Sequence, residues 1–278
     1  MSKKKIVFAM LAFAGILAAG YWWNENRKES IRDAINPLYW IARWQGKDLF
    51  DYKHDILYHG NRKYREVAMT IDDGPHYPTG EQLLDIFKAN GVHATFFMVG
   101  LRMKEHPEQV RRMIAEGHEA ANHTMDHIRL NTLNPRQIQN EIRDDDINFN
   151  RITGGHLHLL RPPGMDYNNK ILDIAKKMGY VTVSWDCAAK DYDNVSPSFI
   201  INRIMDRVEN GSIILLHDDN ENTVQAMPTL IADLKKAGYR FVTVSQLLAD
   251  LPHPVILPVD KNNLPPIVGK IGAVNIKH

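Results

Sequence analysis

The chain has 278 residues, and its 34 lysines and arginines nearly balance 33 aspartates and glutamates, so the formal net charge is +1. This balance provides no broad basic surface for nucleic acid, whose binding depends on clustered lysine and arginine. A single cysteine excludes an internal disulfide and a thiolate cage, so a metal site must use histidine and carboxylate ligands. The chain also carries 13 histidines, some of which are candidates for that role.

The N-terminus carries a membrane-directed segment. Residues 6–23 run without a charged side chain behind three lysines and end in Tyr-Trp-Trp. At about 1.5 Å per residue a helix of this length spans about 27 Å, close to a hydrocarbon core of about 30 Å. The lysines favour a cytoplasmic start and hence a signal-anchor. The competing interpretation is a cleaved signal peptide, because small residues at 18–20 suit a signal peptidase, and the chain would then be secreted.

After residues 1–23, residues 24–64 form a predicted connecting arm with one amphipathic helix from Ser30 to Trp44. From Arg65 on, apolar strand patterns alternate with amphipathic helix patterns that end at glycine. This alternation predicts an α/β domain over residues 65–250 with a parallel sheet, either open or rolled into a barrel. The tail at 251–278 is rich in proline and predicted to be extended. The predicted strands cover residues 65–71, 92–100, 180–185, 212–217 and 239–248, and the helices cover 80–91, 106–117, 168–179, 198–211 and 227–238.

Two adjacent carboxylates follow the first predicted strand. Asp72 and Asp73 precede Gly74 and Pro75, and both Asp-Gly and Gly-Pro are also ordinary turn formers. Ligands collect at the carboxyl ends of parallel strands. Because buried carboxylates are costly unless they are paired or metal-bound, this pair is a candidate site as well as a turn.

A histidine pair lies further along the chain. His123 and His127 are four residues apart, a spacing that places both imidazoles on one face of a helical turn. With one carboxylate, Asp73 or Asp72, they predict a two-histidine, one-carboxylate metal site with open positions for water and substrate. The alternative is a pair of solvent-exposed histidines on a helix.

Three further groups follow. Arg161 begins the sequence Arg-Pro-Pro-Gly, which joins a fixed cation to a rigid turn that can expose a main-chain N–H. Trp185 ends a predicted strand that is followed by Asp186 and Asp191. His217 ends an apolar strand, where it is either a structural residue or, beside a metal and a carboxylate, a general acid.

Taken in order, these motifs resemble those of the polysaccharide deacetylases, the family with the chitooligosaccharide deacetylase homology domain, also called carbohydrate esterase family 4. The resemblance covers residues 65–250 and implies an α/β fold, a distorted (β/α) barrel with fewer than eight strands. It also implies metal-dependent hydrolysis of N-acetyl groups on amino sugars. The matching motifs are TIDDGP at 70–75, HTMDH at 123–127, RPPG at 161–164, DY at 191–192 and LLH at 215–217.

The resemblance implies a metal site and a base. Asp73, His123 and His127 would hold one divalent ion, zinc or else cobalt or another divalent ion. Asp72 would accept the proton of the attacking water, with Arg161 as its charge partner.

The resemblance also implies an acid and a substrate pocket. His217 would protonate the leaving amine, and Asp191 would orient it and keep it charged. The main-chain N–H of Gly164 would stabilise the oxyanion. Leu215 would line the pocket for the acetate methyl, and Trp185 would wall the groove.

Two positions depart from the family pattern. Gly164 and Met165 stand where an aromatic residue and then glycine are usual, which alters the groove wall. Ala188 replaces an acidic residue three before Asp191, and Asp186 is expected to compensate for it. These changes affect substrate preference and leave the expected ligands, base and acid in place.

Three functional hypotheses remain. The membrane segment favours a deacetylase of N-acetylglucosamine in peptidoglycan, since an anchor would hold the domain beside the wall of a bacterium. The same chemistry also suits chitin oligomers, an exopolysaccharide or O-acetylated xylan. The third hypothesis is a non-catalytic glycan-binding module, which would not require Asp72 or His217.

Overall fold

The computed structural model describes residues 49–255, 257 and 258. The predicted membrane segment, the predicted helix at 30–44 and residues 259–278 of the tail lie outside the described residues. Within the part that is described, no helix is both long and apolar enough to cross a membrane.

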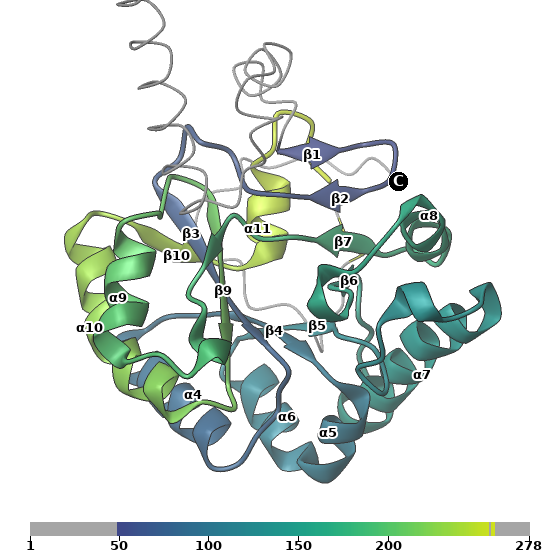
Figure 1. Ribbon diagram of the computed structural model, residues 1–278, viewed down its shortest axis with the longest axis horizontal. Helices are drawn as coiled ribbons and strands as arrows, with labels where there is room; N and C mark the ends of the chain where they lie inside the picture. Colours follow the sequence, from purple (N-terminus) through teal and green to yellow (C-terminus); the bar gives the residue numbers. More distant parts are fainter. Residues whose placement is uncertain (1–48, 256, 259–278) are drawn as a thin grey trace, which may run out of the picture. The chain divides into compact units, whose positions relative to one another are not determined.

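One sheet organises the described chain. Its strands follow the order β1-β2-β7-β6-β5-β4-β3-β9-β8, and β10 pairs with the beginning of β3. The β1–β2 pair is antiparallel, whereas the other pairs are parallel. Figure 1 shows this sheet curled, with helices along its outside. The strands are β1 (Phe50–Asp51), β2 (Ile56–Leu57), β3 (Glu66–Asp72), β4 (Thr95–Met98), β5 (Glu119–Asn122), β6 (Leu159–Leu160), β7 (Val181–Val183), β8 (Cys187–Ala188), β9 (Ser212–His217) and β10 (Arg240–Val242).

The helices begin at local signals in the sequence. The side chains of Asn134, Asn168, Ser196 and Asn220 accept hydrogen bonds from main-chain N–H groups of the helices that follow them. The α-helices are α4 (Thr79–Asn90), α5 (Gly100–Glu105), α6 (Pro107–Ala115), α7 (Pro135–Thr153), α8 (Asn169–Lys177), α9 (Pro197–Met205), α10 (Glu221–Lys236) and α11 (Val244–Ala249). Short 3-10 helices are η1 (Leu130–Thr132), η2 (Pro163–Met165) and η3 (Asp191–Asp193).

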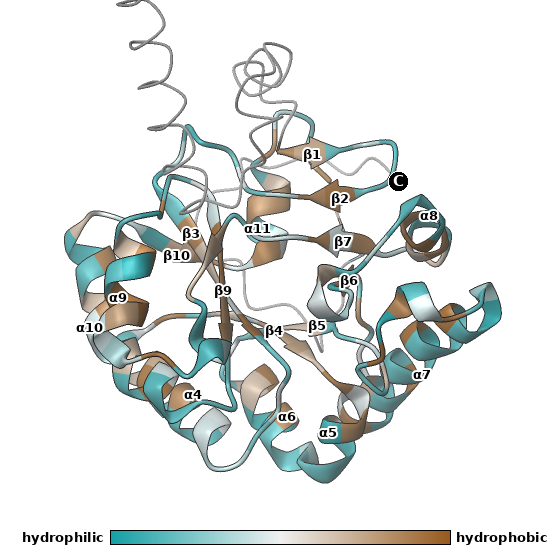
Figure 2. Cartoon of the chain, viewed as in Figure 1, coloured by the Kyte–Doolittle hydropathy of each residue, from teal (hydrophilic) through white to brown (hydrophobic). Residues whose placement is uncertain are grey.

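The two faces of the sheet have different tasks. Ile71 of β3 and Leu216 of β9 belong to the hydrophobic core, together with helix residues such as Phe87. Side chains alternate along a strand, so the neighbouring Asp72 and His217 project from the opposite, inner face. Figure 2 shows hydrophobic colour on the strands and hydrophilic colour on the outer parts of α7 and α10. Helices thus pack against one face of the sheet and stabilise it. On the other face, the ends of the strands carry polar side chains.

The predicted α/β class and parallel sheet are confirmed, but the expected number of strands is wrong. In the described residues the sheet has ten strands, not fewer than eight, and its curled shape is consistent with the expected distorted barrel. Four of them, β1, β2, β6 and β8, are two residues long, too short to show an alternating pattern in the sequence. Residues 50–57, which fall in the predicted arm, supply β1 and β2.

Four other elements differ from the sequence prediction. The strand predicted over 239–248 ends at Val242, because α11 begins at Val244, where the Gln246 side chain accepts a hydrogen bond from the Thr243 N–H over 2.9 Å. Helix α10 begins at Glu221, before the predicted 227, since Asn220 caps it and Pro228 is accommodated inside the helix. Helix α7, the longest in the part of the chain that the structure describes, and strand β5 are not among the predicted elements.

Candidate active site

Three metal-ligand candidates converge at the carboxyl ends of β3 and β5. The Oδ1 atom of Asp73 lies 3.3 Å from His123 Nε2 and 3.0 Å from His127 Nε2. His123 Nδ1 is 2.6 Å from the main-chain oxygen of Arg161, so it donates there and leaves the Nε2 lone pair directed at the cluster. Two imidazole nitrogens and one carboxylate oxygen, all within 4.8 Å of one another, fit zinc or a similar divalent ion.

The two histidines are brought together by a loop, so the predicted helical turn is wrong. Thr124 and His127 have positive φ angles of 69° and 56°, which a right-handed helix does not allow. Neighbouring elements hold the loop in place. The N–H of Gly100 donates to the Thr124 carbonyl over 3.1 Å, and Asp126 N–H donates to a carboxylate oxygen of Glu141 in α7 over 3.0 Å.

The Asp73 carboxyl is held in its charged form. Burial alone would raise its pKa, but the hydrogen bonds and charges of His123 and His127 outweigh burial and hold the pKa well below its usual range. An ionised carboxylate beside two imidazoles is the state that a divalent cation requires of these ligands.

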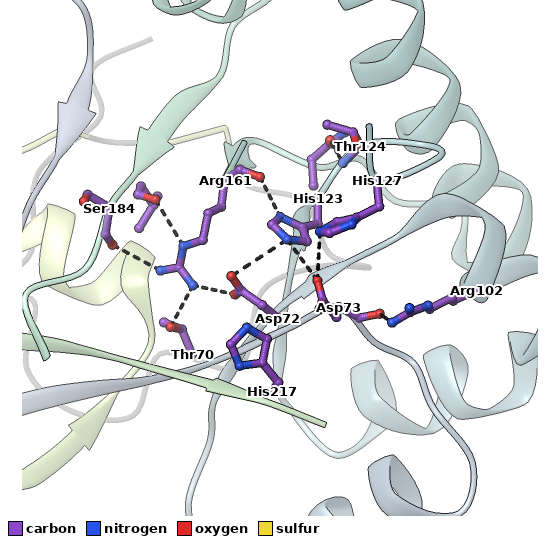
Figure 3. Close-up of polar contacts among 12 residues, drawn as sticks. Thr70, Asp72, Asp73, Arg102, His123, Thr124, His127, Arg161, Ser184 and His217 are labelled. Atoms are coloured by element: carbon purple, nitrogen blue, oxygen red, sulfur yellow. Dashed lines mark hydrogen bonds and ion pairs between the residues drawn. The ribbon is translucent and has the colours of Figure 1, made fainter. Parts of the chain in front are cut away.

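Asp72 connects the metal cluster to a buried cation. Its Oδ1 accepts a hydrogen bond of 2.5 Å from Arg161 Nη1, and both side chains are almost completely buried. Its other oxygen, Oδ2, lies 3.9 Å from His123 Nε2. Figure 3 shows Asp72 between the Arg161 guanidinium and the three candidate ligands. One oxygen is therefore fixed by the cation, and the other lies beside the metal cluster.

Arg161 is itself fixed on several sides. Besides Asp72, it donates to Thr70 Oγ1 at 2.9 Å, to the Val183 carbonyl at 3.2 Å and to the Ser184 carbonyl at 3.1 Å. Its guanidinium carbon lies 3.9 Å from the centre of the Phe97 ring. This network satisfies a buried charge that would otherwise be costly, and it prevents Asp72 from changing its orientation.

His217 is paired with a buried carboxylate on the other side of Asp72. Both its main-chain N–H and its Nδ1 contact Asp191, at 2.7 Å and 2.9 Å, and Asp191 also accepts from Thr223 Oγ1. Burial alone would lower the pKa of His217, but Asp191, with smaller effects from Asp72 and Asp73, raises it to about 9. An imidazole with this pKa is protonated at neutral pH and can donate a proton from Nε2.

The remaining predicted residues also lie on this side of the sheet. Gly164 is exposed at φ 62°, a left-handed conformation that suits glycine, in the turn after Arg161. Leu215 is buried two residues before His217 and so shares its face of β9. The centre of the Trp185 ring lies 5.5 Å from the guanidinium carbon of Arg161.

The expectation that Asp186 compensates for Ala188 is wrong. The Asp186 carboxylate accepts from Arg62, Ser212 and the N–H of Ile213 at 2.7, 3.0 and 2.8 Å. These partners lie at the beginning of β9, whereas His217 ends that strand. Asp186 therefore orders the opposite end of the strand.

A second histidine–aspartate pair was not found from the sequence. Asp218 is fully buried and accepts from the main-chain N–H and the Nδ1 of His76, at 3.0 and 2.6 Å. A Cβ at Gly74 would lie 2.3 Å from Asp218 Oδ2, so glycine is needed there. This pair ties the loop after β3 to the end of β9, on the helix side of the sheet. In the sequence, the only indication that Asp218 is important is its position directly after His217.

The arm also contributes to this end of the sheet. Tyr58 follows β2, and its side chain pairs with that of Tyr167, which follows the Arg-Pro-Pro-Gly turn. Burial, with a smaller effect from Tyr167, raises the pKa of the Tyr58 hydroxyl. Residues 24–64 show no clean periodicity, so no pattern in the sequence indicates this contact.

Comparisons with known proteins agree with this geometry. The family model for polysaccharide deacetylases matches residues 59–183. A peptidoglycan-N-acetylglucosamine deacetylase of Bacillus cereus is 39% identical over 187 residues, covering 66% of this chain and 87% of the relative. The peptidoglycan-N-acetylmuramic acid deacetylase PdaA of Bacillus subtilis is 32% identical, covering 70% of this chain and 76% of the relative.

A solved structure shares the fold. The Bc1960 peptidoglycan N-acetylglucosamine deacetylase, crystallised with an N-hydroxybenzamide compound, superposes with a TM-score of 0.69 at 31% identity. The match covers 70% of this chain and 93% of that structure. With these likenesses spanning most of each relative, and the family's motifs gathered at one end of the sheet, the chain belongs to the polysaccharide deacetylase family.

Proposed function

We propose that the protein hydrolyses the N-acetyl group of N-acetylglucosamine in peptidoglycan, with a bound divalent metal. The observation that carries this proposal is the position of Asp72. One of its oxygens is held by Arg161 and the other lies 3.9 Å from the Nε2 of a candidate metal ligand. A glycan-binding module has no need of this arrangement, whereas a hydrolase needs a fixed carboxylate beside the metal.

The metal site and the base act on water. Asp73, His123 and His127 would hold the ion, which would supply Lewis acidity toward water and toward the acetyl carbonyl. Asp72 accepts the proton that the attacking water loses, through Oδ2, because Oδ1 is engaged by Arg161. Arg161 keeps the carboxylate oriented during this transfer and is itself held by main-chain carbonyls.

The acid and the turn after Arg161 complete the reaction. His217 donates its Nε2 proton to the amide nitrogen as the carbon–nitrogen bond breaks, so acetate and a free amine leave. Asp191 holds the ring through Nδ1 and stabilises its charged form. We assign the N–H of Gly164 to the oxyanion, Leu215 to the acetyl methyl group and Trp185 to the groove wall.

Zinc is the metal that we propose, because two imidazoles and one carboxylate with open positions are typical of catalytic zinc. We further propose that the domain acts outside the cytoplasm, in the bacterial cell envelope. The names of the relatives, which act on peptidoglycan, support this location. Residues 1–23 would anchor it in the membrane or, if they are cleaved, direct its secretion.

Purified protein incubated with peptidoglycan tests the proposal. We expect acetate release that stops with a chelator and returns with zinc. Mass spectrometry of the digested glycan shows which sugar has lost its acetyl group. Loss from muramic acid instead would favour the second candidate activity, to which the likeness to PdaA points. No release from any acetylated glycan would contradict a catalytic role.

A further inference from the structure

The beginning of α5 contacts both loops that carry the candidate metal ligands. These are the loop after β3 and the loop at 123–127, which we call the histidine loop. Three successive main-chain N–H groups donate to main-chain oxygens of these loops, since the first N–H groups of a helix have no acceptor within it. The donors and acceptors are Val99 and Gly74 at 2.9 Å, Gly100 and Thr124 at 3.1 Å, and Leu101 and Met125 at 2.9 Å. The start of α5 therefore fixes the two loops relative to each other.

The contact between α5 and the histidine loop is close enough to require glycine. A Cβ added at Gly100 would lie 2.4 Å from Met125 Sδ and 2.8 Å from a carboxylate oxygen of Asp145, which belongs to α7. Any side chain at this position would push the histidine loop away from α5. The hydrogen bonds between them thus depend on an approach that only glycine allows.

Arg102 adds a side-chain contact to this set. Its Nη1 donates to the main-chain oxygen of Asp73. Figure 3 shows Arg102 at the main-chain end of Asp73 and the two histidines at its carboxylate end. Asp73 has a φ of 73°, a left-handed conformation that persists in a residue with a side chain only when the surroundings hold it. The Arg102 guanidinium is one of the groups that hold it.

The guanidinium of Arg102 is restricted in turn. Its Nη1 lies 3.4 Å from Nδ1 of His76, which donates to the fully buried Asp218 over 2.6 Å. Because Nδ1 is engaged by Asp218, its contact with Arg102 restricts the guanidinium by packing. The His76–Asp218 pair therefore limits how far Arg102 can move away from Asp73.

The direction of the Asp73 main chain decides where its carboxylate points. Its Oδ1 must lie between the two imidazoles, where it is now 3.3 Å from His123 Nε2 and 3.0 Å from His127 Nε2. A rotation of the peptide after Asp73 would carry the carboxylate away from both. The hydrogen bond from Arg102 opposes that rotation.

We propose that Arg102 is a positioning residue for the metal site and acts through the main chain of Asp73. It touches neither of the two histidines that complete the site. The inference rests on the proposed function only in taking the ion to be a divalent metal such as zinc. Its consequence is that zinc affinity depends on a side chain that is not a ligand.

A cation this close to the site could instead act by its charge alone, and the two effects have opposite signs. Removing a positive charge near a bound cation would strengthen zinc binding, because like charges repel. Removing a hydrogen bond that orients a metal ligand weakens metal binding, by about 10–100-fold for such outer partners. One measurement of affinity therefore separates positioning from charge.

The dissociation constant for zinc, measured by competition with a chromophoric chelator, tests the proposal. We expect Arg102→Met to raise it by about tenfold or more. Lys104→Met is the matched control, because it removes an exposed cation from the same helix, and it should change the constant by less than about twofold. The visible absorption of the cobalt-loaded protein reports the ligand geometry. It should change in Arg102→Met and stay unchanged in the control.

Two further variants sharpen the test. Arg102→Lys keeps the charge and a donor, and it should restore the dissociation constant to within about threefold of the wild type. Arg102→Gln removes the charge but keeps a polar side chain, and it should weaken zinc binding as Arg102→Met does. Near-UV circular dichroism checks folding. If Arg102→Met does not fold, Arg102→Gln decides the sign of the effect.

Several results would overturn the positioning role. These are unchanged or tighter zinc binding in a folded neutral variant, an equal loss in Lys104→Met, or no zinc binding by the wild type. Acetate release by the wild-type protein from peptidoglycan is measured separately. If zinc affinity falls as expected but no acetate is released, the proposed function fails and the role of Arg102 stands.

Discussion

Asp72 and His217 are paired residues in the parallel register of β3 and β9. Paired side chains on neighbouring strands project from the same face, with their backbones about 4.8 Å apart. The proposed base and acid are therefore direct neighbours on adjacent strands. The Asp72 charge also favours the protonated form of His217, because it is one of the charges that raise the pKa of His217.

Replacing Asp72 by asparagine should lower kcat by about 10²–10⁴-fold, because the amide keeps the shape but cannot accept the proton. Metal content, measured by mass spectrometry after dialysis, should stay near that of the wild type. Asp73→Asn is the matched comparison and should lose metal. Full acetate release by Asp72→Asn would contradict the proposed base.

The pH profile should report His217. The acid works in its protonated form, so kcat/KM should decline as pH rises through about 9. Asp191→Asn removes the largest charge that raises this pKa, and should move the decline to lower pH by about one unit or more. Asp193→Asn, exposed on the same turn, is the control. An unmoved decline in Asp191→Asn would rule out this pair as its source.

The same pair links stability to pH. Because the pKa of His217 is raised by folding, its contribution to the free energy of unfolding is fully present below its ordinary pKa of about 6.5. That contribution is lost as pH rises through about 9. Urea unfolding from pH 6 to 10 should show this loss in the wild type, and a smaller loss in His217→Gln. Equal slopes in both proteins would contradict it.

Arg161→Met should lower the free energy of unfolding by about 3–5 kcal/mol, since it leaves the buried Asp72 without its cation. The double variant with Asp72→Asn should lose less than the sum of the two single variants. Arg111→Met breaks an exposed ion pair with Glu108 and should cost less than about 1 kcal/mol. Additive losses at Arg161 and Asp72 would show that the pair is not coupled.

Zinc should stabilise the fold by binding to its ligands. With free zinc at about 100 times its dissociation constant, the free energy of unfolding should rise by about 2.7 kcal/mol. Magnesium should have little effect, because it prefers oxygen ligands. His123→Ala should abolish the zinc effect. A variant that kept it would contradict the proposed ligand set.

Much of this site followed from residue order alone. Asp72 and His217 each end a strand whose apolar pattern is readable, and Asp73 directly follows the first of them, so their shared edge follows from a parallel sheet. The conformation of the histidine loop did not follow. The spacing of His123 and His127 suits a helix, and the positive φ angles that replace it depend on contacts with α5 and α7.

Contacts distant in sequence were the hardest to predict. Ile56 and Leu57 form β2 by pairing with β7, and β1 pairs with β2 in turn. The local sequence pattern gives no indication of either partner. Asp186 does not compensate for Ala188, because its carboxylate is held by Arg62, which comes from the arm. The His76–Asp218 pair likewise joins two segments that only the folded sheet brings together.

His217 and Asp218 are adjacent and project from opposite faces of the sheet, and this limits how the length of β9 can change between related proteins. His217 faces the catalytic side, and Asp218 fastens the loop after β3 on the helix side. Inserting or deleting one residue in β9 would turn His217 to the helix side and Asp218 to the catalytic side. The proposed acid would then leave the active site, and the contact between Asp218 and His76 would be lost. Changes of length in related sequences should therefore fall in the loops, and be absent from β9 and from the Asp218 position that directly follows it.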